Sequence, residues 1–162
     1  MSSQKLYYED LNPGLSLETA KRTITQEDLE TFTRLSGDYN PLHTDADYAA
    51  TTAFGGLIVQ GALVLSIATG LASSLGYLNG TVEAFVGLDW KYRGPVKVGD
   101  TIWATLRVDK KHPMPGYNGG LVTVYVTIFN QDHKAVQKGT WTLLVRSQNR
   151  DASPTLASVT RP

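Results

Sequence analysis

The second half of the chain alternates apolar and polar residues with a period of two. Successive side chains of a β-strand point to opposite faces, so each alternating segment presents one apolar face. Alternation with β-branched and aromatic residues is typical of antiparallel strands packed on one side. In the first such segment the face consists of Val86, Leu88, Trp90 and Tyr92. The four segments are VGLDWKY (86–92), TIWATLRV (101–108), VTVYVTIF (122–129) and WTLLV (141–145).

The first half of the chain predicts a weaker strand, at about 15–24, and then helices. Thr25 is suited to cap a helix that has an apolar stripe of Leu29, Phe32 and Leu35 and ends at Gly37. A second, short helix is expected after Thr44, as its N-cap.

The segment GALVLSIATGLASS, residues 61–74, predicts a third helix that is apolar nearly all round. Such a helix is buried on most sides. One central helix against an antiparallel sheet that curls around it is an α+β fold. We therefore expect one domain over residues 1–147, followed by a tail at 148–162 that is rich in Ser, Thr and Pro.

Composition excludes several classes of function. Lys plus Arg and Asp plus Glu number 15 each, so no net field favours nucleic acid or an acidic membrane as partner. The chain has no cysteine, which excludes disulfides, thiolate metal sites and a cysteine nucleophile. Its start has no signal-like apolar stretch, and GALVLSIATGLA is too short to span a bilayer. We expect a soluble, cytoplasmic protein.

The segment SGDYNPLHTDADYAA, residues 36–50, places Asp38 and His43 on either side of Pro41. Proline disfavours the helical conformation at the residue before it, here Asn40. Asp38 and His43 therefore do not lie one turn apart on a helix. The bend is a way to aim a carboxylate and an imidazole at one point, and it is equally an ordinary turn before a helix.

The approach to the central helix, FGGLIVQG, carries glycines at 55, 56 and 61. The first N–H groups of a helix lack helical partners and carry partial positive charge. In a site poor in water such donors stabilise a developing oxyanion. With Asp38 and His43 nearby, the parts suit general acid–base chemistry beside a polarised carbonyl. Taken singly, Asp38 is also a standard turn residue, and Gly61 also relieves crowding against a strand.

The combination of these residues resembles the hydratase-2 signature of the MaoC-like dehydratase family, which includes (R)-specific enoyl-CoA hydratases. Its pattern G-D-x-N-P-L-H is matched by residues 37–43, and the resemblance extends over about 7–146. The resemblance implies a single hot-dog fold, in which an antiparallel sheet wraps a long central helix. It also implies reversible addition of water across the α,β double bond of an acyl thioester. No metal is implied, and no cofactor beyond the coenzyme A of the substrate.

The same resemblance implies roles for particular residues. Asp38 and His43 would hold the reacting water, and the Gly61 N–H would bind the thioester carbonyl. Asn40 would steady the loop, and a role for Thr69 is left open. Gln60 stands where many members have histidine, so any proton transfer by that histidine is missing here. If the residue at this position only shapes the oxyanion and substrate-binding site, glutamine can replace histidine. Family geometry further implies homodimers, or higher multiples of dimers, with the sheets side by side and the site at the subunit boundary.

Two other functions have to be weighed. A hot-dog thioesterase commonly carries a glutamate on the central helix, and residues 61–76 contain no acidic residue. A non-catalytic acyl-thioester-binding module predicts loss of Asp38 or His43, and both are present. The acyl group is not readable from the sequence. Lys91 and Arg93 are candidates for contacting coenzyme A by position only.

Overall fold

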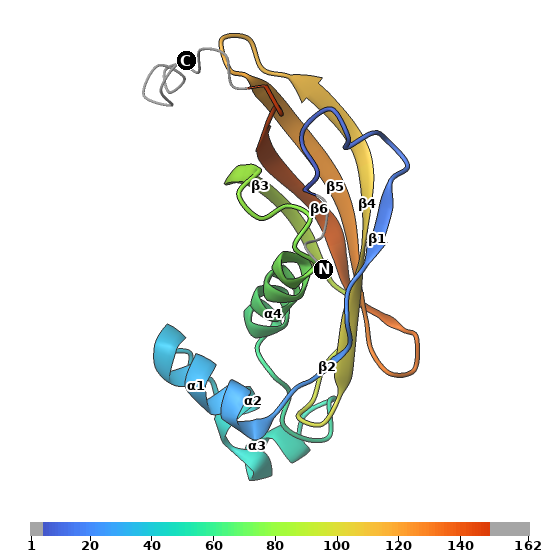
Figure 1. The fold of residues 1–162 in the computed structure, drawn as a ribbon. Coiled ribbons are helices and arrows are strands. Elements are labelled where there is room, and N and C mark those ends of the chain that lie inside the picture. Colours follow the sequence, from blue (N-terminus) through green and yellow to red (C-terminus); the bar gives the residue numbers. More distant parts are fainter. Residues whose placement is uncertain (1–4, 150–162) are drawn as a thin grey trace.

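The structure, a computed structural model, describes residues 5–149. A strongly curved antiparallel sheet wraps a long helix, α4, and three shorter helices lie together at one end of the molecule (Figure 1). This arrangement confirms the expected α+β architecture. The predicted polar tail at 148–162 lies outside the described residues, except for Gln148 and Asn149.

The four strands predicted from alternation are present and longer than the alternating segments. Neighbouring strands in the sheet follow the order β1-β4-β5-β6-β3 and all pair antiparallel. β3 therefore lies at one edge, where it pairs with β6. The strands are β3 Val82–Tyr92, β4 Thr101–Pro113, β5 Gly119–Phe129 and β6 Ala135–Arg146.

The prediction of one continuous strand at about 15–24 is wrong. The structure has two short strands, β1 Ser16–Glu18 and β2 Arg22–Thr23, which both pair with β4. Between them the Thr19 hydroxyl accepts a hydrogen bond from the Ala104 N–H at 2.9 Å. A side-chain oxygen thus takes the place of a backbone acceptor, and the regular ladder is interrupted there.

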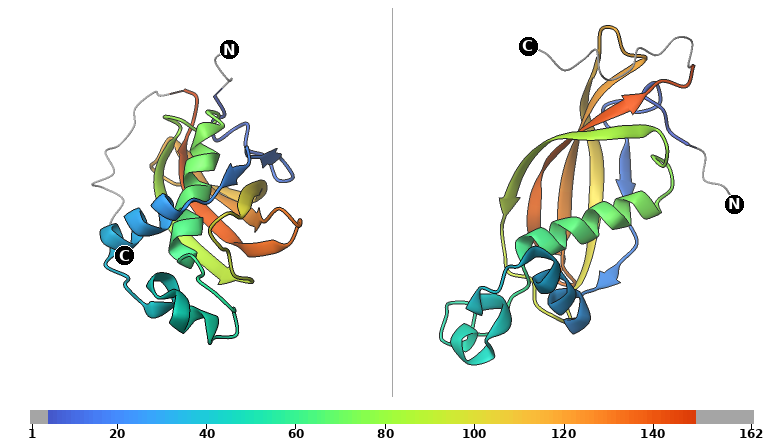
Figure 2. Two further views of the ribbon diagram at one scale, coloured as in Figure 1. Left: turned by 90° about the horizontal axis from the view of Figure 1, so that it is seen from below. Right: turned by 90° about the vertical axis from the view of Figure 1, so that its left-hand side faces the viewer.

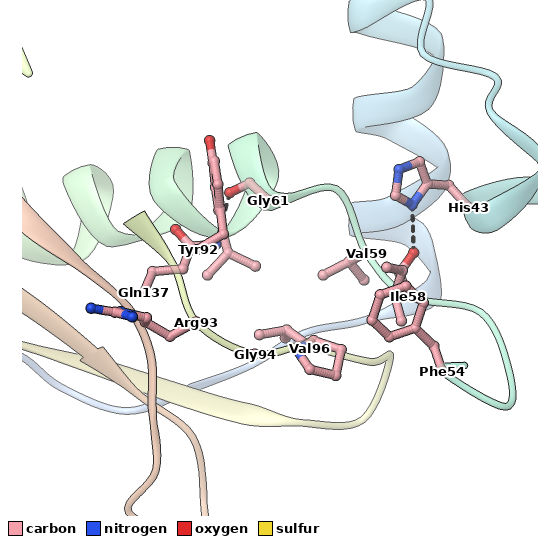
Figure 3. A pocket seen from close by; sticks show the side chains of 12 residues that line it. His43, Phe54, Ile58, Val59, Gly61, Tyr92, Arg93, Gly94, Val96 and Gln137 are labelled. Carbon is pink, nitrogen blue, oxygen red and sulfur yellow. Dashed lines mark hydrogen bonds between the residues drawn. The ribbon is translucent and has the colours of Figure 1, made fainter. Parts of the chain in front are cut away.

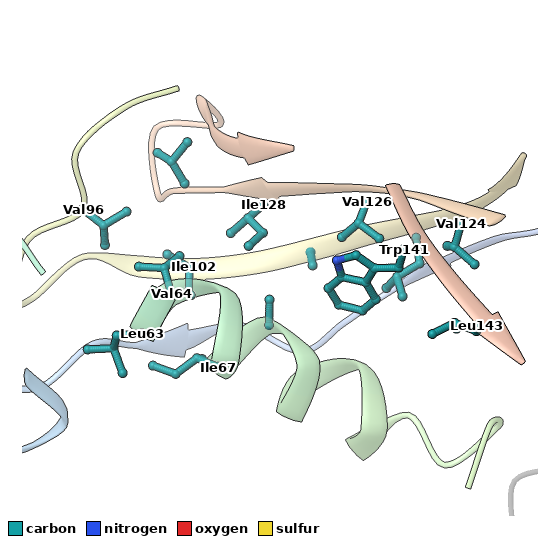
Figure 4. Close-up of a cluster of buried hydrophobic side chains, with 14 of the residues drawn as sticks. Leu63, Val64, Ile67, Val96, Ile102, Val124, Val126, Ile128, Trp141 and Leu143 are labelled. Atoms are coloured by element: carbon teal, nitrogen blue, oxygen red, sulfur yellow. The ribbon is translucent and has the colours of Figure 1, made fainter. Parts of the chain in front are cut away.

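The helix α4, Gly61–Ser74, has the predicted bounds and lies in the concave face of the sheet (Figure 2). The prediction that α4 is buried on nearly all sides is wrong for the single chain. One side of the helix is exposed, and it is lined by Ala62, Ser66, Gly70 and Ser73. These side chains are small or polar, so their exposure costs little. The opposite side packs into the core (Figure 4), whose buried members include Leu63, Val64, Ile67, Ile102, Val124, Val126, Ile128, Trp141 and Leu143.

The helix α1, Gln26–Ser36, begins and ends where the sequence predicts. Thr25 caps it and Gly37 ends it with a positive φ of 73°. Its apolar stripe is only partly buried, since Leu29 is covered while Leu35 is 80% exposed.

Two further helices follow instead of one. They are α2, Pro41–Thr44, and α3, Ala46–Ala50. The expected N-cap at Thr44 is wrong. Asp45 caps α3, and the Thr44 hydroxyl instead donates to the carbonyl oxygen of Asn40.

The edge strand β3 leaves large apolar side chains uncovered. The shared face predicted for this strand is interrupted by a register shift between Phe85 and Gly87, which makes Val86 an extra residue. Phe85 takes the inward position, with its ring centroid 5.6 Å from that of Trp141. Phe85, Val86, Leu88 and Tyr92 are each exposed.

Across the described residues, no helix combines the length and apolar character needed to cross a membrane.

Candidate active site

Asp38 and His43 face one another at the start of α2. Asp38 follows the glycine that ends α1, and His43 lies within α2. Asn40 between them has φ −54° and ψ 134°, a non-helical conformation that agrees with the expected effect of Pro41. The His43 Nε2 atom lies 3.7 Å from the Asp38 Oδ2 atom. The bend thus brings the two side chains together, as the sequence predicts.

The hydrogen bond on the other side of the imidazole determines what the pair can hold. His43 Nδ1 lies 2.7 Å from the carbonyl oxygen of Ile58. A carbonyl oxygen only accepts, so Nδ1 carries the hydrogen, and in the neutral ring Nε2 is then an acceptor. The Asp38 carboxylate is also an acceptor when ionised. A water molecule that donates one hydrogen to each therefore satisfies both groups.

The His43 side chain is 12% exposed and that of Asp38 is 45% exposed. His43 forms one end of a cleft of about 350 Å³ that reaches the first turn of α4 (Figure 3). The walls come from the loop before α4, the end of β3 and the segment after it. Lining residues are His43, Phe54, Ile58, Val59, Gly61, Val64, Tyr92, Arg93, Gly94, Pro95, Val96 and Gln137.

Gly61 lies at the cleft and begins α4. The N–H groups of Gly61 and Ala62 have no helical partner there, whereas that of Leu63 donates to the Gln60 carbonyl oxygen at 3.0 Å. The absence of a side chain has a steric reason here. A Cβ atom at this position would lie 2.5 Å from a ring carbon of Tyr92. Glycine therefore lets the Tyr92 ring approach the backbone at the start of the helix. His43 and Gly61 share one cleft, so an imidazole and a helix N-terminus are available to one ligand. Asp38 does not itself line this cleft and lies next to it, beside His43.

Besides Asp38, the candidate residues Asn40, Gln60 and Thr69 do not line this cleft. The Asn40 side-chain oxygen accepts from the Leu42 N–H at 3.0 Å and so caps α2. The Gln60 side chain is buried and donates to the Thr33 hydroxyl of α1 at 2.8 Å. Thr69 donates to the Ser66 carbonyl oxygen and lines a second cavity, of about 270 Å³, beside the far half of α4.

Sequence reasoning missed Gln137, which lines the cleft from β6 and is only 2% exposed. The sequence did contain a feature that could have identified Gln137. Continuing the alternation of WTLLV backwards from Trp141 places Gln137 on the same inward face, where a polar residue is unusual. The missed cleft residues also include Tyr92, expected only as part of a packed strand face, and Arg93, named only as a contact for coenzyme A.

Comparisons with known proteins agree with the resemblance found in the sequence. Residues 10–128 match the MaoC-like domain family. The chain is 37% identical over 102 residues to an (R)-specific enoyl-CoA hydratase from Rhodospirillum rubrum, which covers 63% of this chain and 69% of the relative.

Solved structures extend the similarity to nearly the whole chain. An X-ray structure of a monoamine oxidase regulatory protein from Archaeoglobus fulgius superposes with a TM-score of 0.86 at 36% identity, over 92% of this chain and 99% of that one. A conserved hypothetical protein from Mycobacterium tuberculosis with a double hot-dog fold superposes with a TM-score of 0.76 at 21% identity, over 93% of this chain and 47% of that one. The hot-dog fold expected from the sequence is thereby confirmed.

Proposed function

The chain belongs to the MaoC-like dehydratase family of hydro-lyases, and from this premise we propose that it adds water reversibly across the α,β double bond of an enoyl-CoA thioester. The observation that carries the proposal is the pair of facing acceptors, His43 Nε2 and Asp38 Oδ2, 3.7 Å apart beside the cleft. Two acceptors that close suit a molecule with two hydrogens to donate, and water is the smallest such molecule.

The proposed chemistry starts from the water held by this pair. Its hydroxyl bonds to the β-carbon while one of the two groups takes the remaining proton. The electrons of the double bond move toward the thioester oxygen, where the Gly61 N–H stabilises the developing charge. A proton then passes from the pair to the α-carbon, so the pair ends with as many protons as it began with. No cofactor beyond the coenzyme A of the substrate enters these steps.

We also propose that the working unit is a homodimer built on the edge of β3. The exposed Val86, Leu88 and Tyr92 on an unpaired strand edge favour the addition of a second strand. Tyr92 belongs both to this strand and to the cleft. A partner strand beside β3 would therefore border the cleft.

Absence of cysteine and of charge imbalance supports a cytoplasmic protein without nucleic-acid or membrane partners.

The acid–base assignment is tested by substituting the pair. Asp38→Asn keeps the shape but removes the charge, and His43→Gln keeps a hydrogen-bonding group but removes titration. Each should lower hydration turnover by about 10²–10⁴-fold, because general acid–base assistance contributes that much. The double variant should be little worse than the poorer single variant, since groups acting as a unit are not additive. Turnover is measured on a panel of enoyl-CoA and 3-hydroxyacyl-CoA thioesters, with the chirality of the product determined.

The same assay separates the competing assignments. If Asp38 and His43 only shape a turn, the variants lose about 1 kcal/mol of stability and keep their turnover per folded protein. Release of free coenzyme A thiol without hydroxyacyl product would instead identify a thioesterase. Binding of the thioesters with neither reaction would identify a binding module.

A further inference from the structure

Gln137 has a buried side chain that connects the sheet to the start of α4. It lies in β6 with its amide facing the cleft. Its Nε2 donates to the carbonyl oxygen of Gly61 at 3.0 Å, and its Oε1 accepts from the indole Nε1–H of Trp90 at 2.8 Å. A buried amide is costly unless its groups are paired. Here both ends of the amide have a partner.

The chemistry of the partners fixes the orientation of this amide. An indole N–H only donates, so the amide oxygen must face Trp90. A carbonyl oxygen only accepts, so the amide nitrogen must face Gly61. A flipped amide would lose both hydrogen bonds. Trp90 in β3 therefore orients Gln137, and Gln137 holds the Gly61 carbonyl.

The start of α4 depends on such external contacts. No side chain makes a capping hydrogen bond to its first N–H groups. Instead, Gln60 is tied to α1 through Thr33, and the Tyr92 ring lies against Gly61. From the side of the sheet, Gln137 holds the peptide between Gly61 and Ala62, which is the neighbour of the peptide that carries the Gly61 N–H. Together these contacts fix the segment whose N–H faces the thioester carbonyl in the proposed reaction.

We propose that Gln137 is a positioning residue for the Gly61 backbone donor, with Trp90 orienting Gln137 in turn. This role rests on the proposed hydration of enoyl-CoA. A helix start that is free to shift loses alignment with an oxyanion that forms only during the reaction. Misplacement of a reacting group by about 1 Å costs on the order of 10²-fold in rate.

The first test compares Gln137→Leu with the wild type. We expect kcat per folded protein to fall by about 10- to 100-fold, because the loss is felt in the transition state. KM should change by less than about threefold, since ground-state binding is spared. Trp90→Phe, which removes the indole N–H and leaves Gln137 in place, should show a smaller loss of the same kind.

The second test uses Gln137→Glu and the pH dependence of its activity. An ionised carboxylate cannot donate to the Gly61 carbonyl, whereas a protonated one can replace the amide donor. The ratio of variant to wild-type kcat should therefore rise as pH falls from about 8 to 6, since burial raises the pKa of a carboxyl group. The other titratable groups of the cleft, His43, Tyr92 and Arg93, are common to both proteins and largely cancel in the ratio.

Val145→Ala is the control for lost packing. Val145 is buried in β6 and does not line the cleft, so this variant should unfold at a lower temperature with kcat per folded protein unchanged. An active wild type with unaltered kcat in Gln137→Leu, or a flat pH ratio in Gln137→Glu, would overturn the positioning role while leaving the reaction intact. A wild type without hydration activity would overturn both proposals.

Discussion

At the scale of single residues, Asn40 connects the two members of the proposed acid–base pair. Its backbone N–H donates to Asp38 Oδ1 at 3.3 Å, and its side-chain oxygen caps the helix that carries His43. The helix has only 4 residues, too few to be stable without a cap. Asn40 therefore acts on the site through the geometry of its neighbours.

Substitution of Asn40 tests this role. Asn40→Ala should lower stability by about 0.5–2 kcal/mol through loss of the cap, and should lower turnover because His43 is held less firmly. Asn40→Ser keeps a capping oxygen and should restore most of both. Thermal unfolding and turnover are measured on the same samples. If the serine variant is as poor in turnover as the alanine variant, the Asn40 amide nitrogen has a direct part in the reaction.

The contacts of the site that the sequence predicts are those between residues that lie close together along the chain. Asp38 and His43 are close in the chain, and Pro41 constrains the bend between them, so their meeting follows from local chemistry. Gln137 and Gly61 are 76 residues apart. Their contact depends on how the whole sheet curves around α4. Gln60 turned toward Thr33 is a similar case, because its partner lies on another helix.

At the scale of elements, α1 is defined by its capping residues. The Thr25 hydroxyl accepts from the Asp28 N–H, and the Asp28 carboxylate accepts from the Thr25 N–H. Burial raises the pKa of Asp28, but hydrogen bonds from Thr25 and the charge of Arg22 outweigh it and hold the pKa below its usual value. The ionised form of Asp28 is therefore the form that stabilises the folded chain.

This shift predicts a pH dependence of stability. A carboxyl group whose pKa is lowered on folding adds stability above its unfolded pKa of about 4, and that stability is lost as pH falls through the folded pKa. Asp28→Asn should cost about 1 kcal/mol at pH 7. The difference in free energy of unfolding between wild type and variant should become smaller below about pH 4. Urea unfolding at a series of pH values measures it, with the exposed Asp47→Asn, also in a first helical turn, as a comparison. A difference that is constant with pH would contradict the role of the charge.

Elements were predictable where one periodicity extends over many residues. The long strands satisfy this condition, and α4 was predictable from a long run of apolar residues instead; the positions of both agree with the structure. The segment at 15–24 has no such extended pattern, and its sequence did not reveal that the Thr19 side chain replaces a backbone acceptor and interrupts the strand. The bulge at Val86 is likewise invisible in a pattern that counts only alternate positions.

At the scale of the whole molecule, the exposed edge of β3 is the feature that the single chain leaves incomplete. Val86 and Leu88 are 51% and 50% exposed on this strand. Paired charges on a strand edge oppose strand addition. The double variant Val86→Lys, Leu88→Lys should therefore sediment as a monomer at micromolar concentration and lose most of its turnover.

Val98→Lys provides a matched control, because Val98 is also exposed but lies outside β3. It should keep the wild-type sedimentation coefficient and turnover. A wild type that sediments as a fully active monomer would contradict the proposed dimer. A β3 variant that stays dimeric would place the interface elsewhere.

The hydrogen bond between Trp90 and Gln137 also limits how this sequence can drift. Losing Gln137 alone leaves the indole N–H of the partly buried Trp90 without its acceptor, and losing Trp90 alone leaves a buried amide oxygen without a donor. For the free energy of unfolding, either single replacement should cost more than both together, since two apolar side chains need no partner. Turnover should still fall in the double replacement, because it also removes the donor to the Gly61 carbonyl. We therefore expect the residues at these two positions to change together among related sequences.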